Sequence, residues 1–292
     1  MGKSDQGPSR RRIFRNGIDV CTGLMAAAAL PAAASAPSTG NETLKTIQSL
    51  RTIHGDFSDK RVPDSDVEVI LDACVRAANA SNMQSYSIIV SRDPAKIKKL
   101  TGYTSGCMLL FCADYVRIVD TAKLMGYDYF ADNAEAFVTS STNTILAAQT
   151  AVIAARSMGI DSLLTNGIHR GDMERNWEIL DLPQIGCFPL IALLLGYPKT
   201  EPGAQKGRLK GAGVVHQEKY RHATKEELEK IILQHDDPAA HLALNDEWKS
   251  KGYKHYLDWF YKDWSRAGKA TTAEGRMAKR LRKSGFIEPQ SA

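Results

Sequence analysis

Four short stretches, far apart in the sequence, combine basic or amide side chains with glycine or with the end of an expected helix or strand. They read RTIHGDF (51–57), AANASNMQSYSIIV (77–90), LLTNGIHRGD (163–172) and AQKGRLKG (204–211). Arginine and lysine bind phosphate through charge-assisted hydrogen bonds, and neutral amides both donate and accept. Each stretch alone is typical of a capped loop. Together they predict a site for a ligand with a phosphate and many hydrogen-bonding heteroatoms.

The first stretch has a second interpretation. It follows a short amphipathic segment in which Leu44, Ile47 and Leu50 lie on one face. A basic residue in the last turn of a helix commonly complements the helix dipole. From this stretch alone, Arg51 is therefore either a helix-terminus residue or an anion ligand.

Hydrophobic periodicity predicts the elements that position these stretches. Helices are expected at 65–79, 93–100, 142–159 and 172–180, and strands at 86–91, 107–114, 160–165 and 188–198. The alternation of helices and strands indicates an α/β or α+β core. The helix at 142–159 is apolar on nearly every face, which is typical of a buried central helix.

In this order, the four stretches resemble the nitroreductase family of FMN-dependent oxidoreductases over residues 43–213. Residues 51–54 stand at the family's basic cluster, and residues 78–86 stand at its Ser/Asn/Gln-rich run. Asn166-Gly167 matches its turn after the central helix and strand, and residues 206–208 match its Lys-x-Arg. The chain departs from the family in having Thr52 for serine, Asn166 for an acidic residue, Tyr86 for tryptophan and no proline before Asn79.

The resemblance implies an α+β, nitroreductase-like fold: a mixed sheet flanked by helices, with a helical, aromatic-rich C-terminal extension. It implies FMN as cofactor and two-electron transfer through flavin N5 to a nitroaromatic, a quinone or a similar small acceptor. The cycle would be ping-pong with NAD(P)H as donor, in a homodimer with flavin at the subunit interface. Since the flavin does the chemistry, no catalytic acid or base is assigned. Alternatives are a non-redox flavin-binding or delivery protein, and a binding module that acts through the basic tail.

The resemblance also assigns roles to residues. Phosphate ligands would be Arg51, Thr52 and His54 together with Lys206 and Arg208. Ribityl and flavin-edge ligands would be Asn79, Asn82 and Gln84. The turn at Thr165, Asn166 and Gly167 would present backbone N–H groups to the N5/O4 side of the flavin. Apart from the resemblance, Asn-Gly turns often use positive φ, so Gly167 is expected there. His169, which follows this turn, is interpreted as a surface residue, with an approach to the substrate as the alternative.

The N-terminus has the features of a twin-arginine signal. Arg11, Arg12 and Phe14 precede a short apolar run that ends in the small-residue triplet 34–36. The sequence thus predicts a cleaved signal at 1–36, an FMN-binding core at 37–215 and a C-terminal extension at 216–292. A membrane anchor is the rival interpretation of the apolar run. An exported protein would be periplasmic and would take electrons from a quinol or a redox protein, whereas a cytoplasmic one would use NAD(P)H.

Charge and cysteine usage narrow the function classes. The formal net charge is +5, and residues 1–36 contribute five basic and two acidic side chains to it. A protein built around nucleic-acid binding is therefore not expected, although the tail mixes tryptophan and tyrosine with lysine. The tail aromatics are expected to pack on the core or on a partner. There is no C-x-x-C or H-E-x-x-H pattern, so no metal site is predicted. Cys107 and Cys112 are expected on opposite faces of one strand.

We predict that replacing Arg11 and Arg12 by lysine retains the precursor in the cytoplasm, because the twin-arginine route depends on the arginine pair. The measurement is the distribution of the protein between cytoplasmic and exported fractions, with Arg10→Lys as the matched control. Export of the double variant at the level of the control would show that this assignment is wrong.

Overall fold

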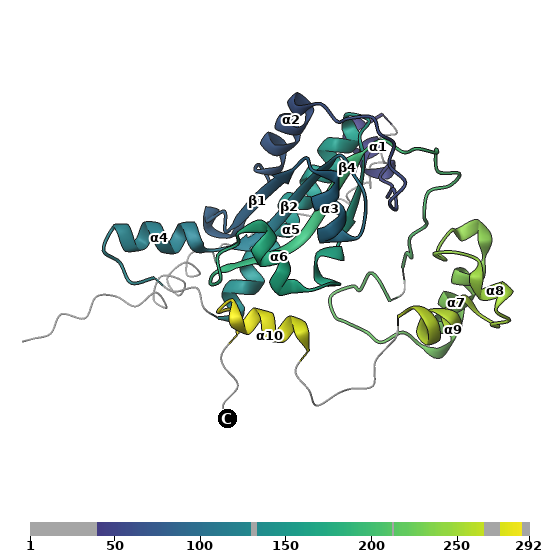
Figure 1. Cartoon of the computed structure of the whole chain (residues 1–292). Helices are drawn as coiled ribbons and strands as arrows, with labels where there is room; N and C mark the ends of the chain where they lie inside the picture. The colour runs from purple at the N-terminus through teal and green to yellow at the C-terminus, as the bar shows by residue number, and fades with distance from the viewer. Residues whose placement is uncertain (1–39, 130–132, 212, 266–274, 288–292) are drawn as a thin grey trace, which may run out of the picture. The chain divides into compact units, whose positions relative to one another are not determined.

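A four-stranded sheet forms the centre of the computed structural model, which describes residues 40–129, 133–211, 213–265 and 275–287 (Figure 1). The strands are β1 (Tyr86–Ser91), β2 (Cys107–Asp114), β3 (Asp161–Thr165) and β4 (Cys187–Gly196), in the order β1-β2-β4-β3. All three strand pairs are antiparallel, and an isolated parallel bridge joins Thr52 to Ser162 in β3. The expected α+β class is confirmed. Among the described residues, the bridge between Thr52 and Ser162 is the only parallel pairing.

Helices cover the sheet and form the C-terminal region. The α-helices are α1 (Glu42–Gln48), α2 (Asp64–Cys74), α3 (Pro94–Thr101), α4 (Val116–Leu124), α5 (Ala134–Ser157), α6 (Met173–Leu180), α7 (Lys225–Asp236), α8 (Glu247–Ser250), α9 (Tyr256–Trp259) and α10 (Arg276–Lys283). Short 3₁₀ turns are η2 (Ala80–Asn82), η3 (Gly167–His169) and η4 (Pro238–Ala240), and a π-helical turn, η5, spans Phe260–Trp264. No helix among these described residues is both long and apolar enough to cross a membrane. The predicted signal at 1–36 lies outside the described residues.

The core has two parts because β2 is buried on both faces. Alternate residues of β2 belong to different hydrophobic clusters: Met108, Leu110 and Cys112 to one, and Cys107, Leu109 and Phe111 to the other. This confirms that Cys107 and Cys112 point to opposite faces. The second cluster also contains Ala147, Ala148, Ala151 and Ala155 of α5, whose small side chains allow the helix to lie close to the sheet. Each large side chain buried in this way contributes about 1.5–3 kcal/mol.

Helix α10 packs on the core rather than standing alone as a basic tail. The side chain of Arg280 is 2% exposed, and its Cζ lies 3.8 Å from the centre of the Trp177 ring. Arg280 also pairs with Glu174 at 3.1 Å. The hydrogen bond from Lys283, helped by Arg280, lowers the pKa of that carboxyl. Phe286, just after the helix, is fully buried in the cluster that contains Trp177. Farther upstream, Trp248, Tyr256 and Trp259 form a separate small cluster.

Gly167 is required by close packing between η3 and α3. A Cβ atom at Gly167 would lie 2.2 Å from the carbonyl oxygen of Thr101, far inside van der Waals contact. The expected positive φ at Gly167 is wrong, because this residue begins a 3₁₀ turn and Asn166 before it has φ −87°. The glycine therefore serves a close backbone approach and not a left-handed turn.

We predict that Gly167→Ala lowers the free energy of unfolding by about 1–3 kcal/mol, the usual cost of overpacking. Gly171→Ala is the matched control, because nothing lies within 4 Å of a Cβ at that position and its φ is not positive. Urea unfolding of both variants provides the measurement. Equal midpoints for the two variants would contradict the close approach.

Candidate functional site

The first of the four polar stretches is fixed to the edge of the sheet. It leaves α1 and runs beside β3, where the N–H of Ile53 donates to the carbonyl of Ser162 at 3.0 Å. The bridge between Thr52 and Ser162 is part of the same contact. Backbone pairing with β3 therefore sets the positions of Arg51 and Thr52.

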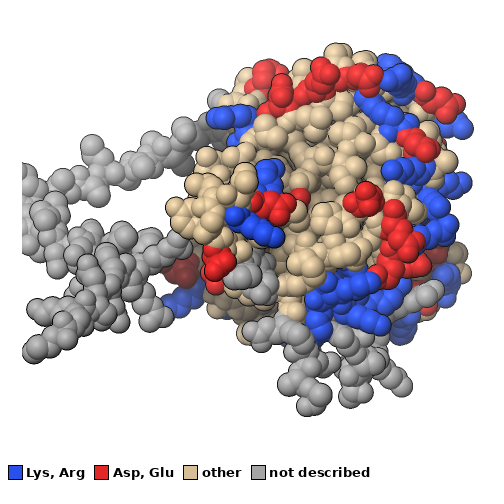
Figure 2. Space-filling model, turned by 60° about the vertical axis from the view of Figure 1, so that its left-hand side comes forward, with Lys and Arg blue, Asp and Glu red and all other residues tan. Residues whose placement is uncertain are grey.

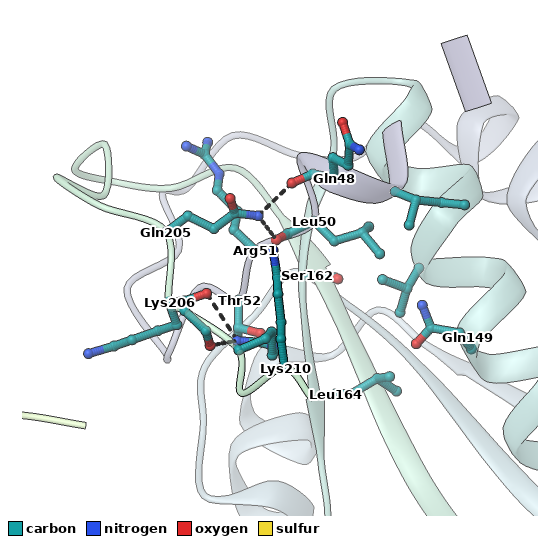
Figure 3. A pocket seen from close by; sticks show the side chains of 14 residues that line it. Gln48, Leu50, Arg51, Thr52, Gln149, Ser162, Leu164, Gln205, Lys206 and Lys210 are labelled. Carbon is teal, nitrogen blue, oxygen red and sulfur yellow. Dashed lines mark hydrogen bonds between the residues drawn. The ribbon is translucent and has the colours of Figure 1, made fainter. Parts of the chain in front are cut away.

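The fourth stretch, about 150 residues later, returns to the same edge. Gln205 Nε2 donates to the carbonyl oxygens of Gln48 at 2.8 Å and Leu50 at 2.5 Å (Figure 3). This amide ties the segment after β4 to the end of α1. Residues 51–52 and 205–208 therefore face one space, although no local sequence signal links them.

That space is a cavity of about 590 Å³ between α1, α5 and β3. Its polar lining comes from Arg51, Thr52, Gln149, Ser162, Gln205, Lys206, Arg208 and Lys210, and its apolar lining includes Ile47, Val152 and Leu164. We call it the first cavity. A second cavity of about 560 Å³ shares Arg51, Thr52 and residues 205–208 and adds His54, Leu242, Leu244 and Trp264. Of the five predicted phosphate ligands, His54 borders only the second cavity, and the other four border both.

Arg51 is held by carboxylates. Its Nε and Nη2 donate to the buried carboxylate of Asp161 at 2.9 and 2.7 Å, and its Nη1 donates to Glu201 at 2.8 Å. Arg156 approaches the same Asp161 at 2.9 Å. The hydrogen bonds that Arg51 donates to Asp161 raise the pKa of the guanidinium above its ordinary value. This arrangement fixes the guanidinium at the rim of both cavities with all of its nitrogen atoms engaged.

Lys206 and Arg208 behave differently from each other. Lys206 Nζ donates to the carbonyl oxygens of Ala243 at 2.6 Å and Leu244 at 3.1 Å, so it reaches toward the C-terminal region. Arg208 Nη1 donates to the carbonyl oxygens of residues 206 and 207 at 3.1 and 2.8 Å. Within the described residues, both hydrogen bonds of Arg208 come from Nη1, so its Nε and Nη2 stay available to a ligand, whereas the Lys206 ammonium is directed at residues 243 and 244.

Lys210 was not among the residues predicted from the sequence. It lines the first cavity and lies two residues beyond Arg208 in the same basic stretch. The available signal was the recurrence of a basic residue at every second position from 206 to 210. The family-like Lys-x-Arg pattern covers only the first two of these positions.

The amide-rich second stretch lies apart from both cavities. The Asn79 side-chain oxygen accepts from the N–H of Gln84 at 3.0 Å, and Gln84 Nε2 donates weakly to the carbonyl of Asn82 at 3.4 Å. Ser81, Asn82 and Gln84 all have φ near +50°, an uncommon conformation for residues other than glycine. Strain of this kind clusters at ligand sites. In this chain the predicted amides contact one another and border neither cavity.

The third stretch begins where the wall of the first cavity ends. Leu164 lines the cavity, Thr165 is buried and Asn166 is exposed. The N–H of Gly167 donates to Thr165 Oγ1 at 3.0 Å, so it turns inward and not toward a ligand. Tyr103 connects this stretch to the first, because its hydroxyl lies 3.3 Å from His54 Nε2 and 3.4 Å from Arg170 Nη1.

His169 is half-buried, which corrects its interpretation as a surface residue. Its Nε2 lies 2.7 Å from the carbonyl oxygen of Pro189, and its ring packs beside Phe188. Burial lowers the pKa of the imidazole. A neutral ring whose Nε2 bonds to the backbone carbonyl of Pro189 ties the η3 turn to β4. Within the described residues, no group of three or more His, Cys, Asp or Glu side chains has the geometry of a metal site.

Comparison with known proteins gives relatives of one kind. A family model described as Nitroreductase family matches residues 47–197. "FMN reductase (NADPH)" of Bacillus subtilis (strain 168) is 31% identical over 190 residues, 62% of this chain and 75% of that protein. "CR(VI) reductase" of Pseudomonas sp. (strain G-1) is 33% identical over 195 residues, 64% of this chain and 77% of that protein.

The structural comparison covers more of the chain. The structure of B. megaterium NfrA2 superposes with a TM-score of 0.70 at 27% sequence identity, over 86% of this chain and 100% of that one. The superposed region therefore extends well beyond the residues that match the family model. Because that model spans more than half of the 292 residues and the solved structure shares the same architecture, the chain belongs to the nitroreductase family.

Proposed function

We propose that the protein is an FMN-dependent oxidoreductase that takes two electrons from NAD(P)H and passes them to a small acceptor. The observation that carries the proposal is the meeting of residues 51–52 and 205–208 around one cation-lined cavity in a chain of this family. The names of its relatives support FMN and NADPH, since one is called an FMN reductase (NADPH). A nitroaromatic, a quinone or a metal oxyanion is the kind of acceptor we propose, the last because a second relative is called a Cr(VI) reductase.

The donor set of the first cavity fits FMN. A phosphate ester needs cations and N–H or O–H donors, and Arg208, Lys210 and Thr52 supply them in the lining. A ribityl chain needs groups that both donate and accept, which Ser162 and Gln149 provide. The apolar side chains Ile47, Val152 and Leu164 suit the hydrocarbon part of a ligand. These groups would hold the cofactor at the edge of β3.

Bound FMN supplies the redox chemistry, because its ring system takes up two electrons and gives them up again. The protein's own part is to bind and orient it. Asp161 would fix the Arg51 guanidinium, and Arg208 would meet phosphate charge with its free donors. We propose a ping-pong cycle in which donor and acceptor visit the same face of the site in turn, since the part of the chain that the structure describes has one four-stranded antiparallel sheet and no separate dinucleotide-binding domain.

We propose that the active form is a homodimer. The amide-rich residues 79–84 border neither cavity in their own chain, so a second subunit would bring them to the site. One face of the protein carries a broad area of uncharged residues surrounded by charged ones (Figure 2). Helix α5 exposes Val138 at 62%, Ile145 at 43% and Leu146 at 41%. Exposed apolar surface of this kind is typical of an interface.

The electron donor depends on the compartment. NAD(P)H is the donor we propose for a cytoplasmic protein. If residues 1–36 direct export, a quinol or a redox protein would replace NAD(P)H, because the nicotinamide pool lies in the cytoplasm. The core residues described above are the same in either case. Fractionation of the culture therefore decides which donor to test first.

We predict that the purified protein is yellow and releases FMN, not FAD, on denaturation. We also predict that it catalyses reduction of a quinone by NADPH or by a quinol of lower potential. The measurements are the visible spectrum, chromatography of the released flavin and the rate of acceptor reduction. A colourless protein that FMN cannot reconstitute would overturn the proposal. A yellow protein that no acceptor reoxidises would favour a flavin carrier instead.

Arg208→Ala is expected to weaken FMN binding about ten- to a hundredfold, since hydrogen bonds to charged groups are worth about 1.5–3 kcal/mol. Arg208→Lys should rescue only part of the loss, because the planar fork is missing. Equilibrium titration of the flavin-free protein provides the measurement, with Arg175→Ala as a control outside the first cavity. Unchanged affinity in Arg208→Ala would exclude this role.

A further inference from the structure

Lys206 and Gly207 are engaged by the C-terminal region. Lys206 Nζ donates to the carbonyls of Ala243 and Leu244, and the N–H of Gly207 donates to the carbonyl of His241 at 3.0 Å. A Cβ atom at Gly207 would lie 1.9 Å from the carbonyl oxygen of Ala240, so only glycine allows this approach. Figure 3 shows the Lys206 side chain running away from Gln149 and Leu164. The dipeptide thus anchors residues 240–244.

The carboxylates beside Arg51 remove its excess charge. Arg51 and Arg156 share Asp161, and Arg51 Nη1 donates to Glu201, so two arginines face two carboxylates. This group is neutral as a whole. A phosphate dianion in the first cavity therefore depends on the other cations of its lining for net positive charge.

Lys210 is the lysine that remains. It lines the first cavity and not the second, and the described residues give it no hydrogen bond or ion pair. Its ammonium is a compact charge on a flexible stem, so it can follow a phosphate group without disturbing the fold. Lys206, by contrast, would have to give up two backbone carbonyls to do so.

We propose that Lys210, and not Lys206, is the lysine that binds the FMN phosphate, and that Lys206 serves to anchor the C-terminal region. This inference rests on the proposed function. It assigns the phosphate contact to Arg208 and Lys210 and leaves the first residue of the Lys-x-Arg pattern with a structural role. Because Lys210 lacks other partners, its removal costs binding energy only when a phosphate is present.

The experiment compares FMN with riboflavin, which lacks the phosphate. Flavin-free full-length wild type, Lys210→Gln, Lys210→Arg and Lys206→Gln are titrated with each flavin, and quenching of flavin fluorescence gives the affinity. Lys210→Gln is expected to weaken FMN about tenfold at low salt and to leave riboflavin unchanged. The loss should shrink at high salt because an exposed charge is screened. Lys210→Arg should retain most of the FMN affinity.

Lys206→Gln is expected to change the two flavins to the same extent, since a loosened C-terminal region does not distinguish them. A selective loss of FMN in Lys206→Gln, with none in Lys210→Gln, would overturn the inference. Thermal melting of each variant reports whether the fold itself has changed. Failure of the wild-type protein to bind either flavin would overturn the proposed function, and this inference with it.

Discussion

The buried carboxylate of Asp161 determines the geometry of the whole site edge. It begins β3 and holds Arg51 through two hydrogen bonds and Arg156 of α5 through a third. A carboxylate that is 1% exposed is stable only when such partners neutralise it. These hydrogen bonds join three parts of the chain into one unit: the segment after α1, the end of α5 and the first residue of the edge strand β3. Removing one partner from a buried ion pair commonly costs about 3–5 kcal/mol, so this unit and the fold depend on each other.

The elements could be predicted because their signals are local. The alternation along β2 separates Cys107 from Cys112, and the small residues of α5 indicate its burial. Parts of the site could not be predicted, because they depend on contacts across the chain. The sequence around Lys206 resembles a phosphate motif, but the carbonyls that engage it lie 37 and 38 residues later. The Asn-Gly sequence indicated that position 167 requires glycine. It did not indicate the reason, which is the close approach of the Thr101 carbonyl oxygen.

The C-terminal region contacts the core at two places. Residues 240–244 attach to Lys206 and Gly207 beside the site, and α10 buries Arg280 against Trp177 on the core. Between these two attachments, Trp248, Tyr256 and Trp259 form a core of their own. The aromatic, basic tail is therefore packed against the core through these contacts. Its Trp264 also lines the second cavity.

The four cysteines of the described residues are free and buried, so their reactivity can report on how the two halves of the core unfold. Cys112 and Cys187 lie in the cluster on one face of the sheet, and Cys74 and Cys107 lie in the cluster on the other. Burial raises the pKa of Cys74 and of Cys107 to about 11, so neither is a thiolate near neutral pH. An alkylating reagent therefore reaches these thiols only when the corresponding face opens. The order in which they are labelled would show which half of the core separates first.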